Sequence, residues 1–251
     1  MTLRRKLASI YGRIAHTYWT KAPSLLLLAA VVFIPVGFLD ALTTGVDVDS
    51  LDINTGAEIL AVVAATAAIA MTGLLGEVFF SGAVAVFLTN PEHEKAPPIM
   101  EVARRLDYRR LILVDIVYVA FVILGLLLFF VPGILVFVWF GLSGPIVEIE
   151  GRTVRGALTR SLKLVRGNFW LVFLILGPVE LVGDGVAELV GGVVHNLLGD
   201  SFFATWMAES ASNIAFTPIF AIAAVLLTLD LIATKKPGGA GLDPAPRAVT
   251  A

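Results

Sequence analysis

The sequence predicts an all-α integral membrane protein whose helices cross the bilayer several times. Of its 251 residues, 58% are hydrophobic and only 15% are charged, whereas a soluble domain has about 45–50% apolar and about 25% charged residues. Several apolar runs approach or exceed the ~18 residues that suggest a membrane span. Lys and Arg gather between these runs. We therefore predict six transmembrane helices and three cytoplasmic interfacial amphipathic helices in a single domain, residues 1–234.

The first basic segment, residues 3–21, has apolar side chains at helical spacing and Arg and Lys on its polar side. A basic helix with an apolar face is typical of a membrane interface. The first span is predicted at about 23–41. Because Asp40, and not a small-residue cleavage site, ends the apolar run, we expect a retained span instead of a signal peptide. The polar residues 43–56 predict a loop.

The second span is predicted at about 57–88. A helix of that length would extend about 48 Å at 1.5 Å per residue, and a bilayer core is about 30 Å thick. This helix must therefore tilt, kink or protrude. The prolines from Pro91 onward end it, and a second basic helix is predicted at 98–110.

Spans three and four are predicted at about 111–130 and 133–148. The chain is expected to turn between them at 131–133, and Gly144-Pro145 is expected to interrupt the fourth span. Such closely spaced apolar runs indicate a helical hairpin.

The third basic helix is predicted at about 153–166, and Gly167 is placed to end it in a left-handed conformation. Span five follows at about 169–190, an outer loop at 191–207, and span six at about 208–232.

The distribution of Lys and Arg predicts the orientation in the cell membrane. With six spans, all 18 fall before span one, between spans two and three, between spans four and five, or after span six. The positive-inside rule then places both termini in the cytoplasm. Residues 235–251 are rich in Pro, Gly and Ala and predict a disordered cytoplasmic tail.

Motifs in the central region resemble a known family. They are VPGI at 131–134, the spacing of Pro145 from Glu150-Gly151, and AL-x-RS-x-x-LVRG at 157–167 with a following Trp. This combination resembles the glycerophosphoryl diester phosphodiesterase membrane domain family, six-span proteins, best over about 110–178. The resemblance implies the membrane part alone, because the short tail leaves no room for a catalytic barrel of about 250 residues. It implies structural roles for Pro132, Gly133, Pro145, Glu150, Ser161 and Gly167.

Acidic residues within the apolar runs are the candidate intramembrane site. Glu180, Asp184 and Glu188 follow one another at intervals of four, so they share a helix face. Ionisable residues within a span indicate a functional site by default. Either these acids face a cavity that binds a cation or relays protons, or span five ends at Gly177-Pro178 and they lie in outer water. Glu77 faces the bundle interior or sits at the cytoplasmic interface.

The basic helices predict contacts with anionic lipid headgroups on the cytoplasmic side, each charge contributing about 1 kcal/mol. These contacts are expected from Arg4, Arg5, Arg104, Arg105, Arg155, Arg160, Lys163 and Arg166. Asp115 and Asp230 are expected to lean towards the cytoplasmic surface and pair with a basic neighbour. Glu150 is expected to pair with Arg152 or Arg155, or to cap the third basic helix.

The motifs of the common enzyme classes are missing from the sequence. It has no glycine-rich phosphate loop with Lys, no HExxH, no CxxC and no GxSxG. We expect a non-catalytic protein without cofactor or metal, and no nucleic-acid partner. The leading hypothesis is a lipid-interacting scaffold or accessory subunit, with a membrane protein or a second copy as partner.

The alternative hypothesis is a transporter or channel for an ion or small molecule that uses the intramembrane carboxylates. An enzyme acting on lipids ranks last. A water-accessible cavity lined by Glu77, Asp184 or Glu188 would favour transport. A lateral groove beside the basic helices would favour lipid interaction, and a tightly packed bundle with neither would favour a scaffold.

Overall fold

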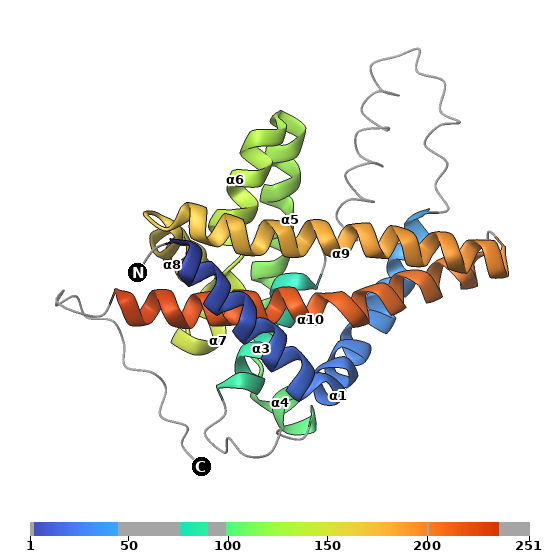
Figure 1. Ribbon diagram of the computed structural model, residues 1–251, viewed down its shortest axis with the longest axis horizontal. Coiled ribbons are helices and arrows are strands. Elements are labelled where there is room, and N and C mark those ends of the chain that lie inside the picture. Colours follow the sequence, from blue (N-terminus) through green and yellow to red (C-terminus); the bar gives the residue numbers. More distant parts are fainter. Residues whose placement is uncertain (1–2, 45–75, 90–98, 200, 236–251) are drawn as a thin grey trace.

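The computed structural model describes residues 3–44, 76–89, 99–199 and 201–235, and every regular element within these ranges is a helix (Figure 1). The predicted helical multi-pass membrane class is confirmed at this level. Five stretches are long and apolar enough to cross a membrane: Leu3–Leu39, Tyr108–Leu128, Phe130–Glu150, Phe169–Leu198 and Phe202–Thr234. Most of the predicted second span and the tail beyond Lys235 lie outside the described residues.

Three long helices carry the bundle: α1 (Leu3–Thr44), α9 (Phe169–Leu198) and α10 (Phe202–Thr234). Helix α10 packs along both α1 and α9 (Figure 1), and its segment from Phe220 to Leu227 is buried throughout. The interfacial helix and the first span expected separately are one helix here, and Pro23 lies inside it.

Helices α9 and α10 form a hairpin with a very short connection. Gly199 has a φ of 73°, and Ser201 caps α10 by accepting a hydrogen bond from the N–H of Ala204 at 3.1 Å. The loop expected at 191–207 is therefore wrong. Residues 191–198 belong to α9, and residues 202–207 belong to α10. The glycines that suggested a loop are tolerated because a helix in contact with neighbours gains more from packing than from propensity.

Pro178 lies inside α9 without ending it. Proline has no N–H to donate to the carbonyl four residues earlier, here that of Leu174. The hydroxyl of Tyr11 in α1 donates to this carbonyl at 2.7 Å. A side chain of a neighbouring helix thus replaces the missing bond, and α9 continues past the point where the sequence suggested an early end.

Helix α3 (Glu77–Leu88) is short and buried between α10, α7 (Ser143–Glu150) and α5 (Tyr108–Leu128). It begins after Gly76, whose φ of 96° breaks the helix predicted at 57–88. Helices α3 and α7 approach so closely that a Cβ on Gly144 would lie 1.9 Å from the carbonyl oxygen of Val78. Helix α4 (Ile99–Arg105) follows α3.

Helix α5 and helix α6 (Phe130–Phe140) form a hairpin that projects away from the α9–α10 pair (Figure 1). The turn lies at Phe129, which has extended backbone, and not at 131–133 as predicted. Pro132 instead occupies the first turn of α6, where its missing N–H breaks no bond. Gly133 allows close approach, since a Cβ on Gly125 would lie 2.9 Å from its Cα. The break before α7 falls at 141–142, ahead of Pro145.

Helix α8 (Val154–Val165) buries one face and exposes Arg155 and Lys163 on the other. Thr153 caps its start by accepting a hydrogen bond from the N–H of Gly156 at 3.3 Å. Gly167 follows it with a φ of 94°, in the left-handed region that its position predicted.

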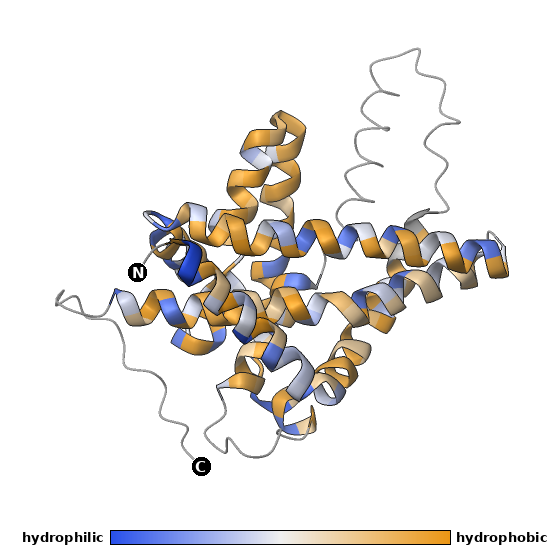
Figure 2. Cartoon of the chain, in the orientation of Figure 1, coloured by the Kyte–Doolittle hydropathy of each residue, from blue (hydrophilic) through white to orange (hydrophobic). Residues whose placement is uncertain are grey.

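Apolar side chains cover much of the outer surface of the described helices (Figure 2). Large examples with more than half of their surface exposed are Trp19, Leu27, Leu124, Leu181 and Leu197. A soluble protein rarely exposes contiguous apolar area of this extent. The exterior therefore agrees with a protein whose solvent is lipid.

We predict that Gly144→Ala lowers the stability of the protein in detergent by about 1–3 kcal/mol, as overpacking of a core does. The added methyl group meets a backbone oxygen, which no rotamer change can move. Thermal unfolding followed by size-exclusion chromatography measures the effect. Gly192→Ala is the matched control, because nothing lies within 4 Å of its Cβ position; we expect it to be neutral or to stabilise by up to about 1 kcal/mol. Equal behaviour of the two variants would contradict the close α3–α7 contact.

Candidate functional site

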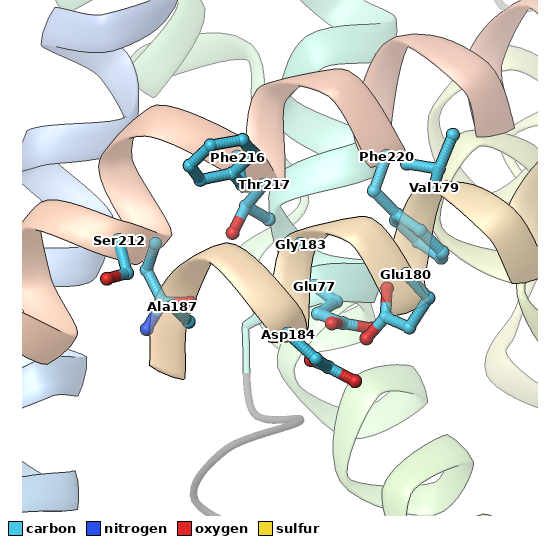
Figure 3. A pocket seen from close by; sticks show the side chains of 11 residues that line it. Glu77, Val179, Glu180, Gly183, Asp184, Ala187, Ser212, Phe216, Thr217 and Phe220 are labelled. Carbon is cyan, nitrogen blue, oxygen red and sulfur yellow. The ribbon is translucent and has the colours of Figure 1, made fainter. Parts of the chain in front are cut away.

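A cavity of about 50 Å³ lies between α9 and α10, with α3 closing one side (Figure 3). Three acidic side chains line it: Glu77 from α3, and Glu180 and Asp184 from α9. We call this cavity the carboxylate chamber. About 10–15 Å³ measured in this way holds one water molecule, so the chamber admits a small cation with a few waters. The other lining residues are Val179, Gly183, Ala187, Ser212, Asn213, Phe216, Thr217 and Phe220.

Glu77 is the most deeply buried acid of the chamber. Glu77 is only 8% exposed, and no hydrogen-bond donor among the described residues reaches its Oε2. The group that approaches it is the carboxyl group of Glu180, within hydrogen-bonding reach (Figure 3). Carboxylates are acceptors only, and a carboxyl group donates only when it carries a proton. The contact therefore requires a proton or another positive charge between the two groups.

Asp115 on α5 holds Glu77 in place from the other side. It is 3% exposed, and its Oδ2 accepts a hydrogen bond from the N–H of Gly76 at 2.7 Å. Its Oδ1 accepts from the N–H groups of Val78 at 3.0 Å and Phe79 at 3.3 Å. These are orphan donors of a helix start, and the positive end of the helix dipole favours a carboxylate there. Asp115 thus caps α3 from a different helix and fixes the residue on which the chamber depends.

The expectation that Asp115 pairs with a basic residue at the surface is therefore wrong. The start of α3 at Glu77 presents several N–H groups without helical partners inside the bundle, and these bind the carboxylate of Asp115. Tyr118, one turn further along α5, was also missed. It is fully buried, its hydroxyl has no partner among the described residues, and it lies within electrostatic reach of Glu77 and Glu180. The signal in the sequence was a polar pair at i and i+3 inside an apolar run.

The three acids of α9 have different environments. Glu180 is half-buried in the chamber, Asp184 is exposed at its edge, and Glu188 is exposed and does not line it. The structure therefore brings Glu180 and Asp184 to Glu77 but leaves Glu188 apart. Glu180 lies about 16 Å along α9 from Phe169 at 1.5 Å per residue. For a helix that starts at a membrane surface, this depth is near the middle of a core about 30 Å thick.

None of the predicted headgroup contacts lines the chamber, and some of the basic residues are paired with acids. Glu150 accepts from Arg152 at 2.6 Å, as expected, and also from Arg160 at 2.9 Å. Arg13, and not Lys235, pairs with Asp230, at 2.7 Å. The remaining predicted headgroup contacts, Arg4, Arg5, Arg104, Arg105, Arg155, Lys163 and Arg166, are exposed.

The motif residue Ser161 and, outside the motifs, Lys235 make close interhelical contacts. The hydroxyl of Ser161 donates to the carbonyl of Trp139 at 2.6 Å and so joins α8 to α6. Lys235 donates through its Nζ to the carbonyl of Lys163, at the end of α8. Loss of solvation, and then the positive charge of Arg160, lower the pKa of Lys235 from its ordinary value.

We predict that Asp115→Asn destabilises the protein by about 1–3 kcal/mol, the cost of leaving buried donors without an acceptor. The amide keeps one acceptor oxygen but turns an NH₂ group towards backbone N–H groups. Thermal unfolding in detergent measures the change, with the exposed Glu188→Gln as control. An unchanged midpoint for Asp115→Asn would contradict the capping role.

No protein-family model matches this chain, and the searches of curated proteins and of solved structures find no match either. The resemblance to the glycerophosphoryl diester phosphodiesterase membrane domain family stays a prediction. The functional conclusion therefore rests on the geometry of the carboxylate chamber.

Proposed function

We propose that this chain is a transporter or channel that binds a cation at the carboxylate chamber and moves it across the membrane. The supporting observation is the contact of two carboxyl groups, that of the buried Glu77 and that of the half-buried Glu180, with an unpartnered oxygen on the first. The lining residues include neither Lys, Arg nor His, so no positive side chain of the lining balances them. Of the two hypotheses drawn from the sequence, this arrangement favours transport.

The energetics make the pair a site of exchange. Two like charges about 4 Å apart repel by about 4 kcal/mol at an effective dielectric constant of about 20. A proton on one carboxyl group removes this repulsion, and so does a cation bound between them. Because both ligands relieve the same repulsion, a cation that enters displaces the proton. The chamber is thus suited to a proton, or to a cation exchanged for a proton.

The proposal includes six spans with both termini in the cytoplasm. Its support is the gathering of basic ends: Arg13 near the start of α1 pairs with Asp230 near the end of α10, and Lys235 reaches α8. These contacts bring three basic segments to one end of the bundle. The positive-inside rule assigns such an end to the cytoplasm.

A second candidate function, lipid contact at this basic end, follows from a groove of about 410 Å³. Lys6 of α1 and the aromatic residues Phe169 and Trp170 at the start of α9 line it. Trp170 is 65% exposed, and aromatic rings beside basic residues are typical of the headgroup region. The expected role as a lipid-interacting scaffold or accessory subunit, with another membrane protein or a second copy as partner, is retained here.

We predict that the protein in liposomes carries protons inward under a potassium–valinomycin potential, measured with a trapped pH-sensitive dye. Glu180→Gln and Glu77→Gln should lower this flux about 10-fold or more, because a hydrogen bond to a charged group contributes about 1.5–3 kcal/mol. Both variants keep the side-chain volume.

Glu188→Gln is the matched control, since it removes an exposed carboxyl group from the same helix outside the chamber. We expect its flux to equal that of the unmodified protein. A flux that is equal in the Glu180→Gln protein, or that does not exceed that of protein-free vesicles, would contradict the proposed transport.

For lipid contact, we predict that charge reversal at Arg155, Lys163 and Arg166 together lowers the amount of anionic lipid that copurifies in mild detergent. Arg160 is left unchanged, because its reversal would also break the bond to Glu150. Each lost charge removes about 1 kcal/mol of attraction to an anionic surface. Lipid mass spectrometry gives the ratio of anionic to total lipid that copurifies with each protein. An unchanged ratio in the variant would contradict the headgroup role.

A further inference from the structure

We propose that the cation taken by this site is an amphiphilic organic cation, an ammonium or phosphonium head with an apolar body. Its head would occupy the carboxylate chamber, and its body the apolar groove that adjoins it. This inference rests on the proposed function and names its substrate class.

The adjoining groove has a volume of about 510 Å³ and runs along α1 and α9 with α10 beside it. Its lining is apolar and aromatic, and no charged side chain is part of it. Tyr11, Tyr18 and Trp19 come from α1, Val182 from α9 and Ile219 from α10. Pockets that bind small molecules measure about 300–1,000 Å³ and have mostly apolar walls, so this groove has the right size and chemistry.

Two side chains belong to both cavities. Val179 of α9 and Phe216 of α10 line the chamber (Figure 3), and both also line the groove. A ligand in the groove is therefore separated from Glu77 and Glu180 by no more than two side chains. Because neither is held by a hydrogen bond or a charge, a rotamer change at these positions joins the two cavities.

The volumes decide which part of a ligand goes where. The chamber, at about 50 Å³, admits a small charged group but not a body of drug size. The groove admits such a body but has no carboxylate to balance a charge. Glu77 is independent evidence that the chamber binds a ligand, because it is more than nine-tenths buried, lines the chamber and has an oxygen without a hydrogen-bond partner. A positive head on an apolar body satisfies both cavities at once.

Aromatic rings favour the same class of ligand. The rings of Tyr18 and Trp19 meet edge to face with centroids 5.6 Å apart, and both line the groove. A cation within about 6 Å of an aromatic ring face is attracted by its quadrupole. An organic cation that approaches from the lipid through the groove is thus attracted before it reaches the carboxyl groups.

The test measures equilibrium binding of radiolabelled 4-phenylbutylammonium, which carries a small charged head at the end of an apolar body, to the purified full-length protein in detergent, by dialysis. The anion 5-phenylpentanoate, with the same apolar body and the opposite charge, is the matched control ligand. We expect saturable binding of the cation at least ~10-fold tighter than that of the anion, because the chamber holds only carboxyl groups. This comparison needs no variant and cannot be confused with misfolding.

Variants then locate the two parts of the ligand. Glu180→Gln should weaken binding of 4-phenylbutylammonium ~10-fold or more by removing charge from the chamber. Ala15→Trp should weaken it to a similar extent by filling the groove, since Ala15 lines the groove and not the chamber. Ala8→Trp, on the exposed part of the same helix and outside both linings, and Glu188→Gln should bind as the unmodified protein does.

The two proposals fail in different ways. Equal binding of cation and anion would show a groove that takes any apolar molecule, a lipid chain included, and would overturn the inference. So would tight cation binding that ignores both Glu180→Gln and Ala15→Trp. If 4-phenylbutylammonium does not bind but proton flux still depends on Glu180, the inference fails and the proposed transport stands. If binding depends on Glu180 and no flux is seen, the site stands and transport fails.

Discussion

The structure around the candidate site depends on one interaction, the carboxylate of Asp115 with three backbone N–H groups at the start of α3. Inside a membrane protein these groups have no water to bind, and each would cost several kcal/mol if left unpaired. With Asp115 in place, α3 can begin at Glu77 within the bundle. The side chain of Glu77 is thereby held inside, next to Glu180, where it lines the chamber.

The chamber also explains how acidic residues persist in an otherwise apolar bundle. Asp115 is balanced by backbone dipoles, whereas Glu77 and Glu180 face each other without a basic side chain in the lining. The charge of Asp115 is balanced within the protein, and this residue has a structural role. The charges of Glu77 and Glu180 are balanced only when a proton or a cation is bound, which is why we treat them as a binding pair and Asp115 as a positioning residue.

The sequence predicted the helical membrane class from its composition and the basic helix over 153–166 from its periodicity. It also predicted the left-handed conformation of Gly167 from the preference for glycine after the end of a helix. It also singled out Glu77, Glu180 and Asp184. It did not predict their contact, since that depends on α3 and α9 each packing against α10, which is distant in sequence from α3. Pro178 and the glycines after it suggested an early end to the fifth span. The helix continues because Tyr11, distant in sequence, supplies the missing bond, and no local pattern reports such a partner.

The bond from Tyr11 to Leu174 lies nearly two helical turns before Glu180, where the acidic face of α9 begins. At Pro178 that helix lacks one of its own backbone hydrogen bonds, so it bends more easily there than elsewhere. Glu180 stands two residues beyond this proline. A small bend at Pro178 would therefore move Glu180 relative to Glu77, and the hydrogen bond from Tyr11 to Leu174 holds α9 to α1 just before that point.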